Sequence, residues 1–178
     1  MNTRAPYKVL FLCTGNSARS IIAEYLLRAR GGRRFESYSA GAKPSGKVNP
    51  YAIEVLQKHY LLDASQARSK SWEEYRDVKF DFVITLCDKA KESCPIWPGQ
   101  PVIAHWGSPD PAAFVGDHGK TLKHFLDVAS QINSRIGIFT AFRDDQLNEW
   151  SVRGIGEQYQ LADTKSSPSA QPPIDPRT

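Results

Sequence analysis

The sequence predicts an α/β fold: a single, doubly wound domain with a four-stranded parallel sheet flanked by helices. Short runs of continuously apolar residues alternate along the chain with longer segments whose apolar residues recur at helical spacing. Strands that are apolar throughout are buried on both faces, and strands separated by helices form parallel sheets with right-handed crossovers. The length of 178 residues fits one domain.

Four apolar runs are the predicted strands. Each is too short to cross a membrane and is followed by turn residues or by a helical pattern. The third run is the clearest of the four. The strands are predicted at residues 8–12, 35–40, 80–86 and 102–106.

Helix signals fill the intervals between these strands. Residues 20–30 place apolar side chains on one helical face, and the Gly-Gly pair at 31–32 ends the pattern. Asn49 is a predicted N-cap followed by Pro in the first turn, and Ser71 begins a capping-box pattern. Residues 121–142 carry the longest helical spacing. Together these signals give the strand–helix alternation of the predicted fold.

The domain is predicted to span residues 1–161, and residues 162–178 are predicted to form a flexible tail. The tail is rich in Pro and Ser and holds too few apolar residues to bury a core. Residues 1–7 lack the apolar stretch of a secretory signal. Three cysteines are too few for a disulfide scaffold, so we expect reduced thiols in the cytoplasm.

The formal net charge is +4, and the positive excess lies in the first hundred residues. Such a mild excess favours small anions and does not by itself indicate nucleic acid. No apolar run is long enough to span a bilayer. We therefore expect neither a nucleic acid nor a membrane as partner.

The most informative stretch lies between the first strand and the first helix and reads Cys-Thr-Gly-Asn-Ser-Ala-Arg-Ser. Doubly wound folds bind ligands at this end of a strand, where the next helix presents free N–H groups. Gly15 and Asn16 suit the positive φ of an anion-binding nest, and Arg19 adds a planar fork. We expect a tetrahedral oxyanion to be bound here by Thr14, Gly15, Asn16, Ser17, Ala18, Arg19 and Ser20.

Cys13 begins this loop and is the candidate nucleophile. The neighbouring N–H groups and the Arg19 guanidinium favour its thiolate, and the Ser17 hydroxyl is a candidate donor to it. The alternative is that Cys13 is a buried strand-end thiol and Arg19 a surface residue. A Cys and an Arg that bracket Gly and Asn at a strand–helix junction favour catalysis.

Two further cysteines, Cys87 and Cys94, follow the third predicted strand, on the same side of the sheet as Cys13. If the segment between them is helical, it spans about 10.5 Å, more than the roughly 4.4–6.8 Å between the Cα atoms of a disulfide. A Cys87–Cys94 bond would then require the helix to unwind. The alternatives are strand-end packing for Cys87 and a loop thiol or metal ligand for Cys94.

Metal binding is not supported by the spacing of these residues. The chain has no CxxC pair, and no His is near either Cys87 or Cys94 in sequence. The four histidines are scattered, and we interpret them as surface or core residues. We predict no metal site.

The loop at residues 13–20 resembles the C-x5-R-S signature of the low-molecular-weight protein tyrosine phosphatases, and so do Ser-Ala-Gly at 39–41 and the Asp110-Pro pair. The resemblance implies that family's fold, with Cys13 as nucleophile and Arg19 binding the oxyanion. It also implies Asp110 as the general acid that protonates the leaving oxygen. By itself, Asp-Pro indicates only a turn.

The stretches TLCDKAKESCPIWPG and HWGSPDP are similar to the arsenate reductases of that superfamily, which are typically coupled to thioredoxin. The resemblance extends from about residue 8 to residue 142. It implies reduction of arsenate to arsenite, for arsenic detoxification, by a three-cysteine relay. Cys13 attacks arsenic, Cys87 attacks the Cys13 sulfur and expels arsenite, and Cys94 then forms a disulfide with Cys87.

The relay also implies where the electrons come from. They pass through thiols, so we expect no bound cofactor but an external reductant, either thioredoxin or glutathione with glutaredoxin. Phosphate or sulfate should mimic arsenate in the loop.

Some relatives bind potassium beside the loop, and Asn16, Glu24 and Ser39 match polar positions of that site. The Asp that those relatives have in this site aligns near Lys70. The Lys70 ammonium is able to supply the positive charge in place of potassium and to pair with Glu24. We therefore predict no potassium. The stretch from residue 137 onward is longer than we expect for the compact members of the family, and we assign no function to it.

Two other functions remain open. A protein tyrosine phosphatase would use the same Cys13 chemistry through a phosphoenzyme, and an oxyanion-binding or thiol-sensing module would use none. Small residues follow Asp110-Pro, which suits a bare oxyanion better than an aromatic substrate. Aromatic rings at Tyr51, Trp97 and Trp106 remain candidates to line the pocket.

Overall fold

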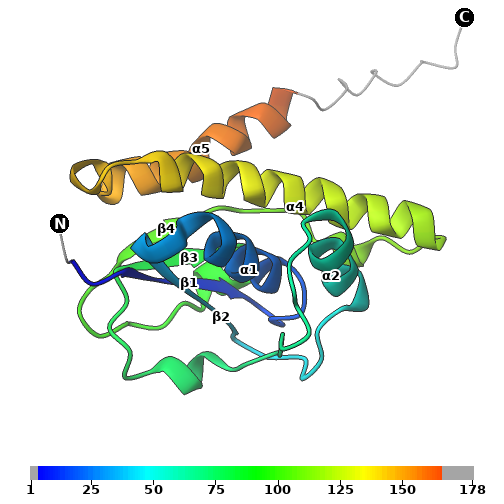
Figure 1. Ribbon diagram of the computed structural model, residues 1–178, viewed down its shortest axis with the longest axis horizontal. Coiled ribbons are helices and arrows are strands. Elements are labelled where there is room, and N and C mark those ends of the chain that lie inside the picture. The colour runs from blue at the N-terminus through cyan, green and yellow to red at the C-terminus, as the bar shows by residue number, and fades with distance from the viewer. Residues whose placement is uncertain (1–3, 166–178) are drawn as a thin grey trace, which may run out of the picture.

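The computed structural model describes residues 4–165 and contains a four-stranded parallel sheet in the order β2-β1-β3-β4 (Figure 1). Leu12 pairs with Thr85, and Thr85 with His105, so β1, β3 and β4 end at the same level and the loops after them meet. All four predicted strands are confirmed. Their bounds are β1 Tyr7–Cys13, β2 Phe35–Gly41, β3 Phe82–Thr85 and β4 Val102–His105.

Long helices cover one face of this sheet, with α1 packed against α4 (Figure 1). The opposite face is covered by α3, by a 3-10 turn at Trp72–Tyr75 and by connecting loops. The helices predicted over residues 20–30 and 121–142 are confirmed as α1 and α4. The helices are α1 Arg19–Gly31, α2 Pro50–Glu54 with a π-helical turn Val55–His59, α3 Asp88–Glu92, α4 His118–Ala141 and α5 Glu149–Lys165.

Local signals explain where these elements begin and end. The Asn49 side chain accepts a hydrogen bond from Tyr51 N, and Gly32 ends α1 with a φ of 54°. The capping box expected at Ser71 forms only in part, because Ser71 accepts from Glu73 N. That segment closes as a short 3-10 turn, in which the tighter winding brings a nearer N–H to the cap.

The sheet separates two apolar cores. Along β1, Val9 and Phe11 face α1 and α4, whereas Leu10 and Leu12 face the opposite side. All four side chains have no exposed surface. A strand buried on both faces accounts for the continuous apolar runs in the sequence.

The last helix, α5, packs against β4. Its Val152 carbonyl accepts a hydrogen bond from Trp106 Nε1 at 2.9 Å, and Arg153 Nε donates to Ile103 O at 3.0 Å. The boundary predicted after residue 161 falls inside α5, and the predicted tail from residue 166 lies outside the described residues. Across residues 4–165, no helix has both the length and the apolar character needed to cross a membrane.

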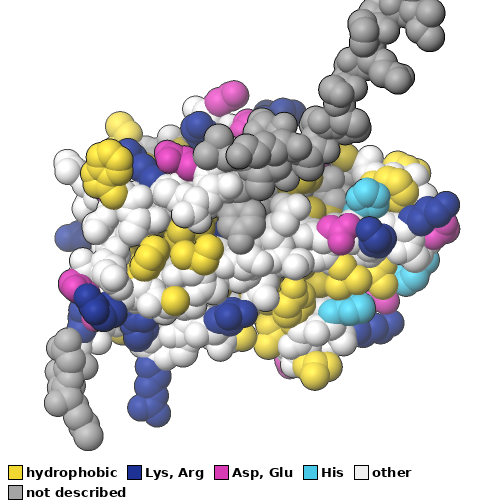
Figure 2. Space-filling model, turned by 90° about the horizontal axis from the view of Figure 1, so that it is seen from above, with side chains coloured by type: hydrophobic (Ala, Val, Ile, Leu, Met, Phe, Trp, Pro, Cys, Tyr) yellow, Lys and Arg dark blue, Asp and Glu magenta, His cyan; other side chains and the backbone are white. Residues whose placement is uncertain are grey.

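Figure 2 shows the helix-covered face of the molecule. Among the described residues visible there, basic and acidic side chains are dispersed between apolar and neutral ones, without a basic patch.

Candidate active site

The loops after β1, β3 and β4 enclose a cleft of about 670 Å³. It brings together most of the residues predicted from the sequence, although they are up to 97 positions apart, from Cys13 to Asp110. Asn16 and Ser20 do not line the cleft but lie buried beneath its floor, and Cys94 is also absent from the lining. The cleft is lined by Cys13, Thr14, Gly15, Ser17, Ala18, Arg19, Cys87, Asp88, Lys89, Glu92, Asp110 and Ala112.

Cys13 lies at the floor of the cleft, and its residue is 3% exposed. Asn16 N donates to Cys13 Sγ at 3.2 Å, and Ser20 Oγ lies 2.8 Å from the same sulfur. The hydroxyl next to the sulfur in this structure is that of Ser20, in the first turn of α1, and not that of the predicted donor Ser17. Ser17 instead lines the cleft. A backbone N–H and a hydroxyl thus contact the sulfur from the buried side of the loop.

Asn16 shapes the loop from within. Its φ is 46°, in the left-handed region that Asn tolerates, and the residue has no exposed surface. Its Nδ2 donates to Ser20 Oγ at 2.8 Å and to Ser39 Oγ at 2.9 Å, while its Oδ1 accepts from Lys70 N at 2.7 Å. These bonds orient the Ser20 hydroxyl that contacts Cys13.

Gly41 allows the loop to approach β2 closely. A Cβ at Gly41 would lie 2.7 Å from Thr14 O, closer than packed atoms come. The Ser-Ala-Gly pattern thus combines a hydroxyl for Asn16 with space for the backbone of the loop.

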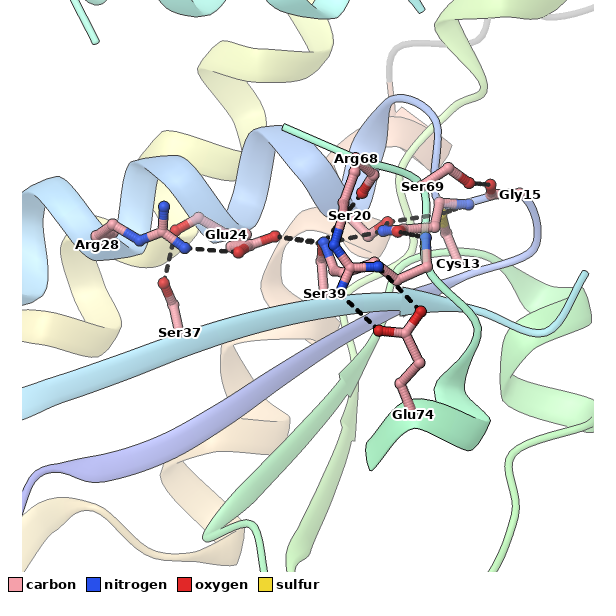
Figure 3. A network of polar contacts seen from close by, with 12 residues as sticks. Cys13, Gly15, Ser20, Glu24, Arg28, Ser37, Ser39, Arg68, Ser69 and Glu74 are labelled. Atoms are coloured by element: carbon pink, nitrogen blue, oxygen red, sulfur yellow. Dashed lines mark hydrogen bonds and ion pairs between the residues drawn. The ribbon is translucent and has the colours of Figure 1, made fainter. Parts of the chain in front are cut away.

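A buried ion pair between Lys70 and Glu24 supports this network, and Figure 3 shows Glu24 with Ser39 and Ser20 of the network. Lys70 Nζ lies 3.2 Å from Glu24 Oε2, 3.2 Å from Ser39 Oγ and 3.1 Å from Arg68 O. Glu24 also accepts from Arg28 at 2.6 Å and from Ser39 Oγ. The pairing of Lys70 with Glu24 predicted from the sequence is confirmed.

Arg19 and Asp110 lie on opposite loops at the mouth of the cleft. Arg19 Nη1 donates to Ser108 O at 3.0 Å, and Arg19 Nη2 lies 3.7 Å from Asp110 Oδ2. The Asp110 side chain is about half exposed, and its Oδ1 accepts from Ala112 N at 3.2 Å. A carboxyl group at the mouth is placed to give a proton to a group leaving the loop.

Cys87 lies across the cleft at the N-cap of α3, where Thr14 Oγ1 is 3.3 Å from its Sγ. Cys94 follows the other end of α3, and both thiols are partly buried against the second core. Burial raises the pKa of the Cys94 thiol, and a weaker hydrogen-bond contribution from Trp97 acts in the opposite direction. The helix expected between the two cysteines is present.

His105 is a residue whose position the sequence did not reveal. Its Nδ1 lies 2.9 Å from Thr85 Oγ1, and its Nε2 lies 3.2 Å from Asp88 Oδ1, next to Cys87. Burial lowers the pKa of His105, and the charge of Lys91 lowers it further, against a smaller opposing effect of Asp88. In the sequence, the one signal for a position near the site was that His105 lies at the end of the strand predicted at residues 102–106.

The aromatic rings considered for the pocket lie elsewhere. Trp106 and Trp97 belong to the two cores, with exposures of 0% and 4%, and Tyr51 stacks on Phe125. None of the three lines the cleft. Within residues 4–158, whose side chains the structure describes, no group of three His, Cys, Asp or Glu is arranged to hold a metal ion.

A cysteine and an arginine in an anion loop, with an acid opposite, define a cysteine-dependent enzyme of the phosphatase type on a doubly wound sheet. The model of the low molecular weight phosphotyrosine protein phosphatases matches residues 8–141, and the chain belongs to that family.

Within the family, the chain is similar to an arsenate reductase of Oceanobacillus iheyensis, 37% identical over 74% of this chain and 93% of the relative. Among solved structures, it is similar to an arsenate reductase in the phosphate binding state, with a TM-score of 0.65 and 30% identity over 76% of this chain and 97% of that one. A low molecular weight protein tyrosine phosphatase from T. tengcongensis has a TM-score of 0.63 and 27% identity, covering 74% of this chain and 95% of its own.

Proposed function

We propose that the protein reduces arsenate to arsenite through Cys13, Cys87 and Cys94. The observation that carries this proposal is the second thiol at the anion loop, where Cys87 lies beside Thr14. A phosphatase needs only the nucleophile of the loop. A thiol facing that nucleophile across the cleft supplies what a reduction needs in addition, namely a second sulfur to take part in a disulfide.

The first step is substitution at arsenic. Arsenate resembles phosphate in shape and charge, so the N–H groups of the loop and Arg19 would bind its oxygens. The Cys13 thiolate attacks arsenic, a sulfur–arsenic bond forms, and one oxygen leaves. Asp110 gives this oxygen a proton, so that it departs as water or hydroxide. Arsenic remains in its pentavalent state.

The second step is the reduction. The Cys87 thiolate attacks the Cys13 sulfur, a sulfur–sulfur bond forms, and the sulfur–arsenic bond breaks. The electron pair of the broken bond goes to arsenic, which leaves as trivalent arsenite. The two thiols together have lost two electrons, and these are the two that arsenic has gained.

The third step returns Cys13 to the loop. The Cys94 thiolate attacks the Cys87 sulfur and expels the Cys13 thiolate, leaving a Cys87–Cys94 disulfide. Because α3 lies between the two residues, this step requires α3 to unwind. Unwinding would also expose the new disulfide to a reductant outside the chain.

An external dithiol or thiol must then supply two electrons. Thioredoxin, or glutathione with glutaredoxin, fits this chemistry, and the cytoplasm is the compartment in which such thiols stay reduced. We propose no resident cofactor. The ammonium of Lys70 occupies the position beside Glu24 and Ser39, and we propose that it makes a potassium ion unnecessary.

Phosphotyrosine hydrolysis is the second candidate. The complete set of Cys13, Arg19 and Asp110 favours it, since these groups suffice to form and hydrolyse a phosphoenzyme. The cleft lining contains no aromatic ring that would pack against a tyrosyl group. We therefore expect aryl phosphate hydrolysis as a secondary activity of the same loop.

Cysteine variants separate the two candidates. Cys87→Ser and Cys94→Ser should each abolish repeated arsenite production with thioredoxin, while hydrolysis of p-nitrophenyl phosphate continues. Cys13→Ser should abolish both activities and serves as the matched control. Arsenite production at the parental rate by both resolving-cysteine variants would contradict the relay. Repeating the assay with glutathione and glutaredoxin identifies the reductant.

A further inference from the structure

Helix α4 carries a charged side chain into the apolar core. Arg135 is 1% exposed, and its neighbours on the same buried face of α4 are Ile132, Ile136 and Phe139. Burying a guanidinium removes it from water, which is unfavourable unless its donors are used by the protein. The hydrogen bonds of the buried Arg135 guanidinium therefore have to offset its lost contacts with water.

Two hydrogen bonds of Arg135 reach the loop that leads from β4 to Asp110. Arg135 Nη1 donates to Ser108 Oγ at 2.7 Å and to Trp106 O at 3.0 Å. Ser108 Oγ also donates to Trp106 O at 3.3 Å, and Ser108 is itself buried. Arg135 thus fixes the loop from inside the domain.

The outer side of the same loop contacts the active site. Ser108 O accepts from Arg19 Nη1 at 3.0 Å, and Ser108 N donates to Leu86 O, next to Cys87, at 3.1 Å. Asp110, two residues further along, lies 3.7 Å from Arg19. Ser108 therefore connects Arg135 in the core with Arg19 at the anion loop.

We propose that Arg135 is a positioning residue: it holds the loop at 106–110 so that Arg19 and Asp110 face the bound oxyanion. The role of Asp110 as acid rests on the proposed function, but the placement of Arg19 concerns anion binding alone. Without Arg135, the Ser108 carbonyl would lose its fixed position, and the Arg19 guanidinium would no longer be held toward the loop.

The test compares Arg135→Met with Phe125→Leu. Phe125 is a buried residue on the same helix whose ring stacks on Tyr51 and not on a residue of the loop, so its variant measures what lost core packing alone does. The readouts are the dissociation constant of inorganic phosphate by calorimetry and the kinetics of arsenate reduction, well below both melting temperatures. We expect Arg135→Met to weaken phosphate binding about tenfold, as for loss of a charged hydrogen bond, and Phe125→Leu to leave it unchanged.

A second readout reports on Asp110. In Arg135→Met, kcat/KM should fall more for phenyl phosphate than for p-nitrophenyl phosphate, because the poorer leaving group depends more on the acid. Arg135→Lys should recover part of the loss. Should Arg135→Met fail to fold, Ser108→Ala carries the test, since it removes one hydroxyl and keeps the carbonyl that holds Arg19; about a fivefold loss is expected.

Parental phosphate affinity and an unchanged leaving-group dependence in Arg135→Met, or in Ser108→Ala if that variant carries the test, would overturn the proposal and leave Arg135 a purely structural residue. If the parental protein binds phosphate but does not reduce arsenate, the proposed function fails. The role of Arg135 is then still decided by the phosphate affinities of the variants.

Discussion

Thr14 Oγ1 lies 3.3 Å from Cys87 Sγ, which joins the anion loop after β1 to the thiol after β3. The contact exists because β1 and β3 are neighbours in the sheet although their sequences are far apart. When Cys87 is a thiolate, the hydroxyl donates to it and stabilises the attacking form.

Replacing Thr14 by Val should slow the attack of Cys87 on the Cys13 adduct. A hydrogen bond to a charged group contributes about 1.5 kcal/mol or more, so arsenite release in a single turnover should fall about tenfold. Thr14→Ser keeps the hydroxyl and should retain most of the rate. Hydrolysis of p-nitrophenyl phosphate does not use Cys87, and Thr14→Val keeps the backbone N–H of the anion loop, so this reaction should lose much less than arsenite release; an equal loss in both reactions would contradict this role.

The raised pKa of Cys94 predicts a pH dependence of its reactivity. Burial favours the neutral thiol, so the thiolate fraction is small at neutral pH and grows with pH beyond the ordinary value of 9.0. In a Cys13→Ser, Cys87→Ser background, the rate of alkylation of Cys94 by iodoacetamide should therefore keep rising above pH 9. A rate that levels off below pH 9 would contradict the assignment.

Weakening α3 should expose the partly buried Cys94 thiol and make it react faster. Lys91 is exposed on α3, and Gly is less favourable than Ala in a helix by about 1 kcal/mol. Lys91→Gly should speed alkylation of Cys94 at pH 7 about fivefold relative to Lys91→Ala, which serves as the control. Equal rates in the two variants would show that Cys94 reacts without unwinding of α3.

The buried pair of Lys70 and Glu24 should contribute strongly to stability. Lys70→Met leaves a buried carboxylate without one of its partners and should lower the free energy of unfolding by about 3 kcal/mol, measured by urea denaturation. Lys58→Met, which breaks a pair at the surface, should change the free energy of unfolding far less. Stabilisation of the parental protein by potassium chloride over sodium chloride would argue against Lys70 as the resident cation.

Two glycines of α5 give a matched pair of substitutions. A Cβ at Gly156 would lie 2.0 Å from His105 O, whereas one at Gly154 meets nothing within 4 Å. Gly156→Ala should destabilise the protein by about 2 kcal/mol or more, because backbone atoms must separate. Gly154→Ala should stabilise it by about 0.5–1 kcal/mol. Thermal melts of both variants check the contact between α5 and β4.

The strands and the anion loop could be predicted because their signals are local: apolar runs, Gly and Asn before a helix, and an Arg at fixed spacing. Choosing Ser20 over Ser17 required knowing which side of the first turn of α1 faces the sulfur. That orientation depends on Asn16, whose Nδ2 donates to both Ser20 Oγ and Ser39 Oγ on β2, a tertiary contact that no local pattern contains.

Other features were beyond the sequence because they depend on tertiary contacts. The short helix α3 has too few residues for a visible period, so the position of His105 beside Asp88 could not be predicted. In the part of α5 whose side chains the structure describes, residues 149–158, the buried aliphatic side chains are Val152 and Ile155, and Gly156 makes a close approach to β4, which leaves a weak helical pattern.

The position of α5 also bears on self-association. β4 is the last strand in the order β2-β1-β3-β4, and the unpaired backbone groups of such a strand can pair with a strand of another molecule. Arg153 Nε occupies the carbonyl of Ile103, and Gly156 packs against that of His105. Helix α5, which lies beyond the family match, thus covers this edge of β4, and a protein shortened before Glu149 would leave the two carbonyls uncovered.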